Sequence, residues 1–91
     1  MAGTRAHVIL TGDVQGVFFR GTTRLEAERR GVTGWVRNRP DGSIEAVFEG
    51  ESIAVEQIVN WCRTGPPRAE VENLDVEYSD YQGEFVRFSV L

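Results

Sequence analysis

The apolar and polar positions divide the chain into short segments of two kinds. Residues 6–11 alternate between apolar and polar side chains and predict a strand that runs into a glycine-containing loop. Residues 19–30 repeat apolar or small side chains at four-residue spacing and predict a helix that ends at Gly31. Thr23 and Glu26 could form a capping box, which would start this helix later.

The second half of the chain shows the same succession of strands and helix. Residues 32–39 and 43–50 predict the two strands of a hairpin, because the Pro-Asp-Gly sequence between them favours a tight turn. Residues 52–64 place four apolar side chains on one helical stripe, and the following Gly-Pro-Pro sequence stops the helix. Alternating strands over residues 73–78 and 84–90 complete the pattern.

The order of elements, βαββαβ, is that of the ferredoxin-like α+β sandwich, in which two helices cover one face of an antiparallel sheet. We therefore predict a single domain over residues 1–91, with a short C-terminal strand added to the sheet. The first and second strands then run parallel across a right-handed crossover. This topology brings Arg20, at the start of the first helix, and Asn38, at the end of the second strand, to the same edge of the domain.

Composition and charge narrow the classes of function. The chain has 91 residues, 41% of them hydrophobic and 26% charged, which is typical of a globular domain. The net charge of −4 counts against nucleic-acid binding, which usually requires a basic surface. No apolar run approaches the roughly 20 residues that a membrane-spanning helix needs, and the first residues lack the apolar core of a signal peptide. We expect a cytoplasmic protein without nucleic-acid or membrane partners.

Several residues that could carry chemistry have a simpler interpretation. Cys62 is the only cysteine, which excludes an internal disulfide and any metal site built from several thiolates. All ten basic residues are arginines, so a functional arginine must be selected by its position. The chain stops at Leu91, after the last predicted strand, which favours a free-standing protein, and we expect a monomer. The remaining candidates are interpreted as structural, core-packing, turn or solvated residues: His7, Trp35, Arg37, Arg39, Asp41 and Trp61.

The junction between the first strand and the first helix is a candidate anion site. Residues 12–20 read Gly-Asp-Val-Gln-Gly-Val-Phe-Phe-Arg, so a loop with a central glycine leads into a helix start. Unpaired N–H groups and the helix dipole favour an anion there, and Arg20 adds a fork of donors that matches phosphate oxygens. The predicted substrate-binding groups are the backbone N–H groups of Gln15, Gly16, Val17, Phe18 and Phe19.

A second segment extends this interpretation. Residues 34–50 read Gly-Trp-Val-Arg-Asn-Arg-Pro-Asp-Gly-Ser-Ile-Glu-Ala-Val-Phe-Glu-Gly. With residues 12–20, this segment resembles the acylphosphatase family over essentially the whole chain. The first family signature, Gly-x-Val-Gln-Gly-Val-x-(Phe/Tyr)-Arg, is met at every position. The second signature is Gly-aromatic-small-x-Asn-x-x-x-Gly-x-Val, with a further Gly after five more residues. Residues 34–50 meet it with Ile44 in place of valine.

The resemblance implies an acylphosphatase that hydrolyses the carboxyl–phosphate bond of small acyl phosphates. Arg20 would bind the phosphoryl group, and Asn38 would hold the attacking water through its carbonyl and amide groups. The resemblance implies no metal, no cofactor and no covalent intermediate, and it favours a helix start at Phe19. An acyl phosphate leaves as a carboxylate, which needs no protonation, so binding and charge stabilisation can carry the reaction.

Other interpretations stay open. The domain could be a non-catalytic anion-binding module, or one that once served inside a larger carbamoyl-transferring protein. It could also be an RNA-binding ferredoxin-like domain, which would place aromatic residues on the exposed sheet face. Arg20 could be a solvated helix residue, Asn38 could simply close the hairpin strand, and the Gln15 side chain could shape the loop.

Overall fold

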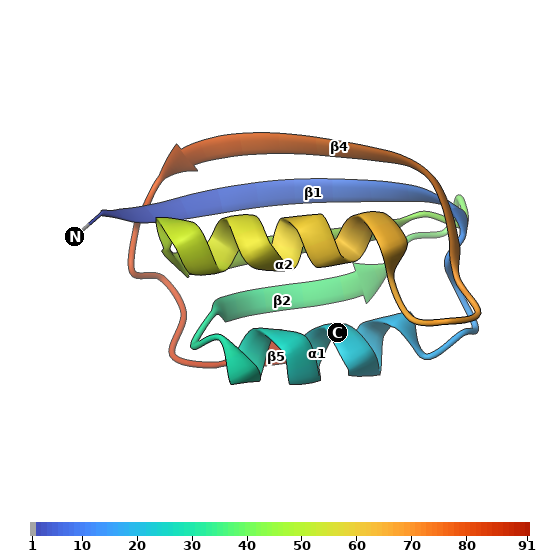
Figure 1. Ribbon diagram of the computed structural model, residues 1–91, viewed down its shortest axis with the longest axis horizontal. Helices are drawn as coiled ribbons and strands as arrows, with labels where there is room; N and C mark the ends of the chain where they lie inside the picture. Colours follow the sequence, from blue (N-terminus) through green and yellow to red (C-terminus); the bar gives the residue numbers. More distant parts are fainter. Residues whose placement is uncertain (1) are drawn as a thin grey trace.

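The computed structural model describes residues 2–91 as two helices packed on one face of a five-stranded sheet (Figure 1). The strands are β1 (Gly3–Asp13), β2 (Thr33–Asn38), β3 (Ile44–Glu51), β4 (Glu70–Asp80) and β5 (Phe88–Val90). They lie in the order β4-β1-β3-β2-β5. The β2–β5 pair is parallel and the other three pairs are antiparallel, so the sheet is mixed.

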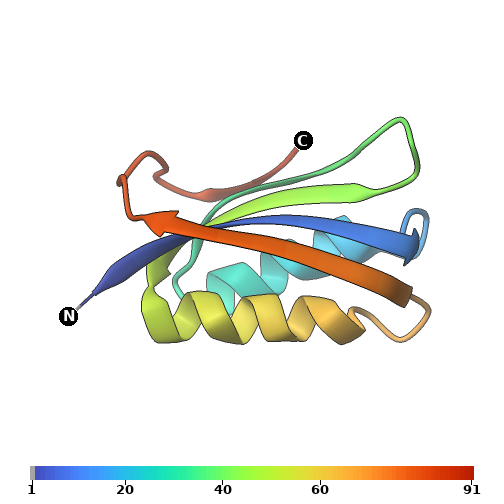
Figure 2. The same cartoon turned by 90° about the horizontal axis from the view of Figure 1, so that it is seen from above.

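Helices α1 (Phe19–Arg29) and α2 (Ser52–Thr64) cover the same face of the sheet, as Figure 2 shows. Alternate side chains of each strand point into this layer, because successive residues of a strand face opposite sides of the sheet. The buried core between helices and sheet is aliphatic and aromatic: Ala6, Val8, Leu10, Val14, Phe19, Ala27, Val32, Val36, Ile44, Ala46, Phe48, Val55, Ile58, Val59, Cys62 and Phe88.

The predicted elements are confirmed, with shifts at their ends. Helix α1 begins at Phe19, and the later start from a capping box is wrong, because the buried hydroxyl of Thr23 donates to the carbonyl oxygen of Phe19 inside the helix at 2.7 Å. The first strand is longer than the predicted 6–11, since β1 pairs with β3 on one side and β4 on the other along nearly its whole length. The predicted 84–90 strand shortens to β5.

A buried carboxylate holds the connection that precedes the last strand. Residues 81–87 cross from β4, at one edge of the sheet, to β5, at the other edge. The fully buried side chain of Glu49 accepts hydrogen bonds from the backbone N–H groups of Gln82 (2.8 Å) and Glu84 (3.1 Å), and lies 3.3 Å from the guanidinium of Arg5. These bonds give two backbone N–H groups of the connection a partner outside any strand and hold the connection against β3.

Two glycines permit close backbone approaches on the strands that lead to the predicted site. Gly12 lies at a register shift between β1 and β4 with a φ of 124°, and a Cβ atom there would clash with the carbonyl oxygen of Glu70. Gly34, with a φ of 137°, leaves no room for a Cβ atom beside the carbonyl oxygen of Val47 in β3. Both conformations are rare for residues with a side chain, so these glycines set the paths of β1 into its loop and of β2 toward Asn38.

Candidate active site

The loop from β1 to α1 presents backbone N–H groups at the start of the helix. Val14 is fully buried and anchors the loop, while Gly16, with a φ of 75°, turns the chain in open space. Phe18 caps α1 in the left-handed conformation (φ 60°, ψ 26°) and its side chain makes no capping hydrogen bond. The N–H groups of the first helical turn have no partner inside the helix, so they are available to an anion in front of it.

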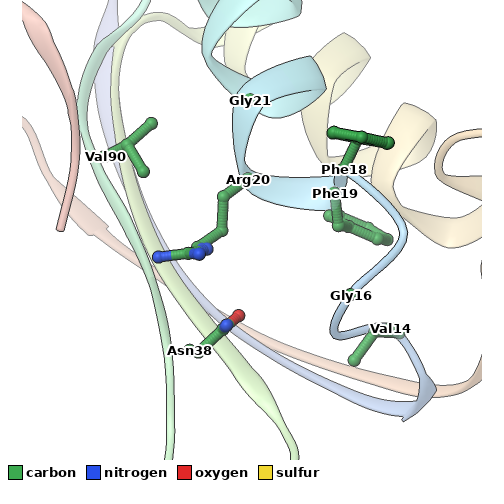
Figure 3. A pocket seen from close by; sticks show the side chains of 8 residues that line it. All are labelled: Val14, Gly16, Phe18, Phe19, Arg20, Gly21, Asn38 and Val90. Carbon is green, nitrogen blue, oxygen red and sulfur yellow. The ribbon is translucent and has the colours of Figure 1, made fainter.

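Arg20 lies in the first turn of α1 and extends across the pocket that this loop borders (Figure 3). Its Nη1 donates a hydrogen bond of 2.9 Å to the main-chain oxygen of Leu91. The guanidinium carries five N–H donors in a planar fork, so one bond to the end of the chain orients the group and leaves donors for a ligand.

Asn38 is the last residue of β2, and its side chain points into the same pocket as the Arg20 guanidinium (Figure 3). Its Oδ1 is buried and has no hydrogen-bond partner among residues 2–91. A buried acceptor without a partner is costly and unusual in a folded protein. An ordered water or a ligand that donates to Oδ1 would satisfy it, which fits the predicted role in holding a water.

The Gln15 side chain connects the loop to the hairpin that carries Asn38. Its Nε2 donates to the carbonyl oxygens of Arg39 (2.8 Å) and Ser43 (2.9 Å). Arg39 and Ser43 are also joined to each other by a backbone hydrogen bond of 2.8 Å. The side chain therefore shapes the loop, one of the two roles that the sequence allowed, and only its backbone N–H is left for the predicted contact with substrate.

The pocket has a volume of about 290 Å³ and lies at the predicted edge of the domain. It brings together Arg20 and Asn38 with five other loop and helix residues and one residue of β5. Its lining is Val14, Gly16, Phe18, Phe19, Arg20, Gly21, Asn38 and Val90. Gln15 and Val17 are not among the lining residues, and Val17 packs against the core. Sequence reasoning missed Val90 and Gly21, since neither stands at a signature position.

Other chemistry-bearing side chains lie away from this pocket. On the sheet face opposite the helices, His7 Nε2 lies 2.7 Å from Glu45, whose other oxygen is 2.6 Å from Arg37. The His7 hydrogen bond, assisted by Arg37, holds the pKa of Glu45 below its usual value. Burial raises the pKa of the Cys62 thiol to about 12. These contacts agree with structural roles for His7 and Cys62.

The remaining site predictions are consistent with ordinary structure. The carboxylate of Asp41 accepts from the backbone N–H of Ser43 at 2.9 Å, as a turn residue does. Among residues 2–91, no group of three or more His, Cys, Asp or Glu side chains is arranged to hold a metal ion. No helix in this part of the chain is long and apolar enough to cross a membrane.

The fold and the pocket define a small ferredoxin-like α+β protein with an arginine and an asparagine converging where a strand enters a helix. A family model for acylphosphatases matches residues 6–90. The chain is 56% identical over 90 residues to an acylphosphatase from Pelotomaculum thermopropionicum, covering 99% of this chain and 98% of that relative. The chain belongs to the acylphosphatase family, and it is an enzyme of the hydrolase class.

Solved structures agree with this assignment. A crystal structure of an acylphosphatase from Bacillus subtilis superposes with a TM-score of 0.93 at 35% identity, over 97% of this chain and 98% of that one. Full-length HypF, in a phosphate- and nucleotide-bound form, matches 98% of this chain with 12% of its own length, at a TM-score of 0.84 and 21% identity. The HypF likeness shows the fold alone.

Proposed function

We propose that this chain hydrolyses small acyl phosphates by a single displacement at phosphorus. Arg20 and the backbone N–H groups at the start of α1 bind the phosphoryl oxygens, and Asn38 holds the attacking water. The observation that carries the proposal is the convergence of Arg20 and the unpartnered, buried Oδ1 of Asn38 on one pocket. A cationic fork and a water-holding amide are the two groups that this reaction requires.

The reaction proceeds by attack of the water oxygen on phosphorus, in line with the bond to the acyl oxygen. The phosphorus–oxygen bond to the acyl group breaks, and its electron pair stays on the carboxylate that leaves. One proton of the water passes to a phosphoryl oxygen, so that dihydrogen phosphate forms without a protein base. Arg20 stabilises the charge on the equatorial oxygens, and donors that are already in place lose little energy in reorganising. Because the leaving carboxylate is stable without a proton, no general acid is needed.

The sequence alternatives receive less support. An RNA-binding role would use free aromatic side chains on the open sheet face. Trp35 lies on that face, but the guanidinium of Arg37 covers its ring at 5.6 Å from the ring centroid, and Arg37 is itself ion-paired with Glu45. A non-catalytic anion-binding module requires donors for the anion, whereas the buried, unpartnered Oδ1 of Asn38 in this pocket is an acceptor. Cytoplasmic location and the monomeric state stay predictions.

Isotope incorporation tests both the activity and the mechanism. Acetyl phosphate is hydrolysed in water enriched in oxygen-18, without added metal, and the label is followed by mass spectrometry. Attack on phosphorus places the heavy oxygen in inorganic phosphate, whereas attack on the carbonyl carbon places it in acetate. Label in acetate would overturn the role of Asn38, and the absence of turnover above the uncatalysed rate would favour the non-catalytic module.

A further inference from the structure

Phe18 is the exposed aromatic residue at the mouth of the pocket. Its side chain is 86% exposed, although it lies next to Phe19, which is buried in the core. Its backbone occupies the left-handed region, with a φ of 60°, and it is the only residue other than glycine with positive φ among residues 2–91. A bulky residue rarely adopts this conformation, and such outliers cluster at functional sites. Packing of the folded chain gives no reason for an aromatic ring here.

The direction of the proposed reaction gives the ring a role. In Figure 3 Phe18 and Asn38 lie on opposite sides of the pocket, and the Arg20 side chain extends from α1 toward the side that carries Asn38. In-line displacement requires the attacking water and the leaving oxygen to be on opposite sides of phosphorus. If Asn38 holds the water, the acyl group leaves on the side that carries Phe18. This step rests on the proposed function.

The neighbouring residues leave space for an apolar group on that side. A Cβ atom on Gly21 would meet no heavy atom within 4 Å, and its backbone is not in a conformation that requires glycine. Alanine would favour the helix at such a position, so the bare backbone keeps space open beside the pocket. Val90 contributes an apolar side chain that is 38% exposed.

The charge of the lining restricts what this space can bind. Arg20 is the only charged side chain among the lining residues that the structure describes, and it is committed to the phosphoryl group. A second anionic group on the substrate would therefore have no counter-charge in the lining. An aromatic or aliphatic group would instead gain contact with the face or edge of the Phe18 ring.

We propose that Phe18, with Gly21 and Val90, forms an acyl-group subsite that favours acyl phosphates with an uncharged, aromatic or otherwise apolar acyl group. The left-handed conformation holds the ring at the pocket mouth instead of allowing it to fold back onto the core. The subsite selects the substrate, while the phosphate-binding loop and Asn38 act on the part common to all acyl phosphates.

The test compares kcat/KM for benzoyl phosphate and acetyl phosphate, which differ in the acyl group alone. The substitution Phe18→Asn removes the ring and keeps a residue that tolerates the left-handed conformation. We expect it to lower the ratio of benzoyl to acetyl kcat/KM about fivefold, since one aromatic contact is lost. Phe18→Tyr should keep the wild-type ratio. Ile53→Asn, which removes a 71% exposed apolar side chain on α2 outside the pocket, is the matched control and should change neither rate.

The outcomes separate the subsite from the proposed function. If the wild type hydrolyses both substrates and Phe18→Asn leaves the ratio within about twofold, the acyl subsite is overturned and the phosphoryl chemistry stands. Better use of succinyl phosphate than of acetyl phosphate would also overturn it, since the lining offers no partner for the extra carboxylate. If the wild type hydrolyses neither, the proposed function fails, and the subsite with it. Phe18→Gly, which relieves the backbone strain, replaces Phe18→Asn if that variant does not fold.

Discussion

Arg20 and Leu91 are joined by a hydrogen bond of 2.9 Å from the guanidinium Nη1 to the main-chain oxygen of Leu91. Leu91 is itself held by β2, because its N–H donates to the carbonyl oxygen of Val36 at 2.9 Å. The arginine is therefore attached at its backbone to α1 and at its side chain to the β2–β5 edge of the sheet. This double attachment aims the guanidinium at the pocket before any substrate arrives, and pre-oriented donors are the more effective ones in catalysis.

The first prediction concerns the geometry of this guanidinium. Arg20→Lys keeps the positive charge but loses the planar fork, so kcat/KM for acetyl phosphate should fall by about 100-fold or more. The free energy of unfolding should change by less than about 0.5 kcal/mol, since the side chain does not contribute to the core. Arg24→Lys, one turn further along α1 and 51% exposed, is the matched control. A Lys variant with most of the wild-type rate would contradict the bidentate role.

Asn38 allows catalysis to be separated from phosphate binding. Its proposed ligand is the attacking water, so Asn38→Ala should lower kcat by about 100-fold while inhibition by inorganic phosphate weakens little. Removing an acceptor that is buried without a partner should leave the free energy of unfolding unchanged or slightly raised. Equal losses in kcat and in phosphate affinity would move Asn38 from holding water to binding substrate.

The sequence predicted the elements and the meeting of Arg20 with Asn38, because both follow from local patterns and from the handedness of one crossover. Side-chain contacts between distant segments could not be predicted from the sequence. The bond from Arg20 to Leu91 joins residues 71 positions apart, and the Gln15 side chain reaches carbonyl groups beyond Asn38. No periodicity encodes such contacts. The hydrogen bonds of Glu49 to the backbone of residues 82 and 84 could not be predicted either. The alternating pattern of β3 predicts an exposed side chain at Glu49, whereas the structure buries its carboxylate.

Gln15 provides a prediction about stability. Gln15→Leu is close in size but donates no hydrogen bonds, so the free energy of unfolding in urea should fall by about 1–3 kcal/mol as the loop separates from the hairpin. The rate of acetyl phosphate hydrolysis should also fall, because the loop would no longer be bonded through Gln15 to the hairpin that carries Asn38. Gln57→Leu, on the exposed side of α2, should change the free energy of unfolding by less than about 0.5 kcal/mol. Lower activity at unchanged stability would instead assign the Gln15 side chain to substrate binding.

Cys62 should not react with thiol reagents while the protein is folded. With its pKa raised to about 12 by burial, the thiol is almost entirely protonated at pH 8, and the thiolate is the reactive form. Labelling with a thiol reagent should therefore proceed only through unfolding, and its rate should rise with urea in parallel with the unfolding rate. Rapid labelling of the native protein at pH 8 would contradict the burial of this side chain beneath α2.

The last prediction concerns pH and metal ions. Guanidinium and amide groups keep their protonation state between about pH 6 and 9, so kcat/KM for a substrate stable over this range should be nearly constant. His7→Ala should not alter this profile, because His7 lies on the sheet face away from the helices and pairs with Glu45.

Below this pH range the stability of the fold should decrease for a separate reason. The pKa of Glu45 is held down by His7 and Arg37, so its stabilising contribution is present above the usual glutamate range and is lost as the pH falls through the lowered pKa.

A strong chelator should leave the rate unchanged, since Arg20 supplies the positive charge and the carboxylate leaves without an acid. A bell-shaped profile between pH 6 and 9, or inhibition by the chelator, would show that a titrating group or a cation carries the chemistry in place of Arg20 and Asn38.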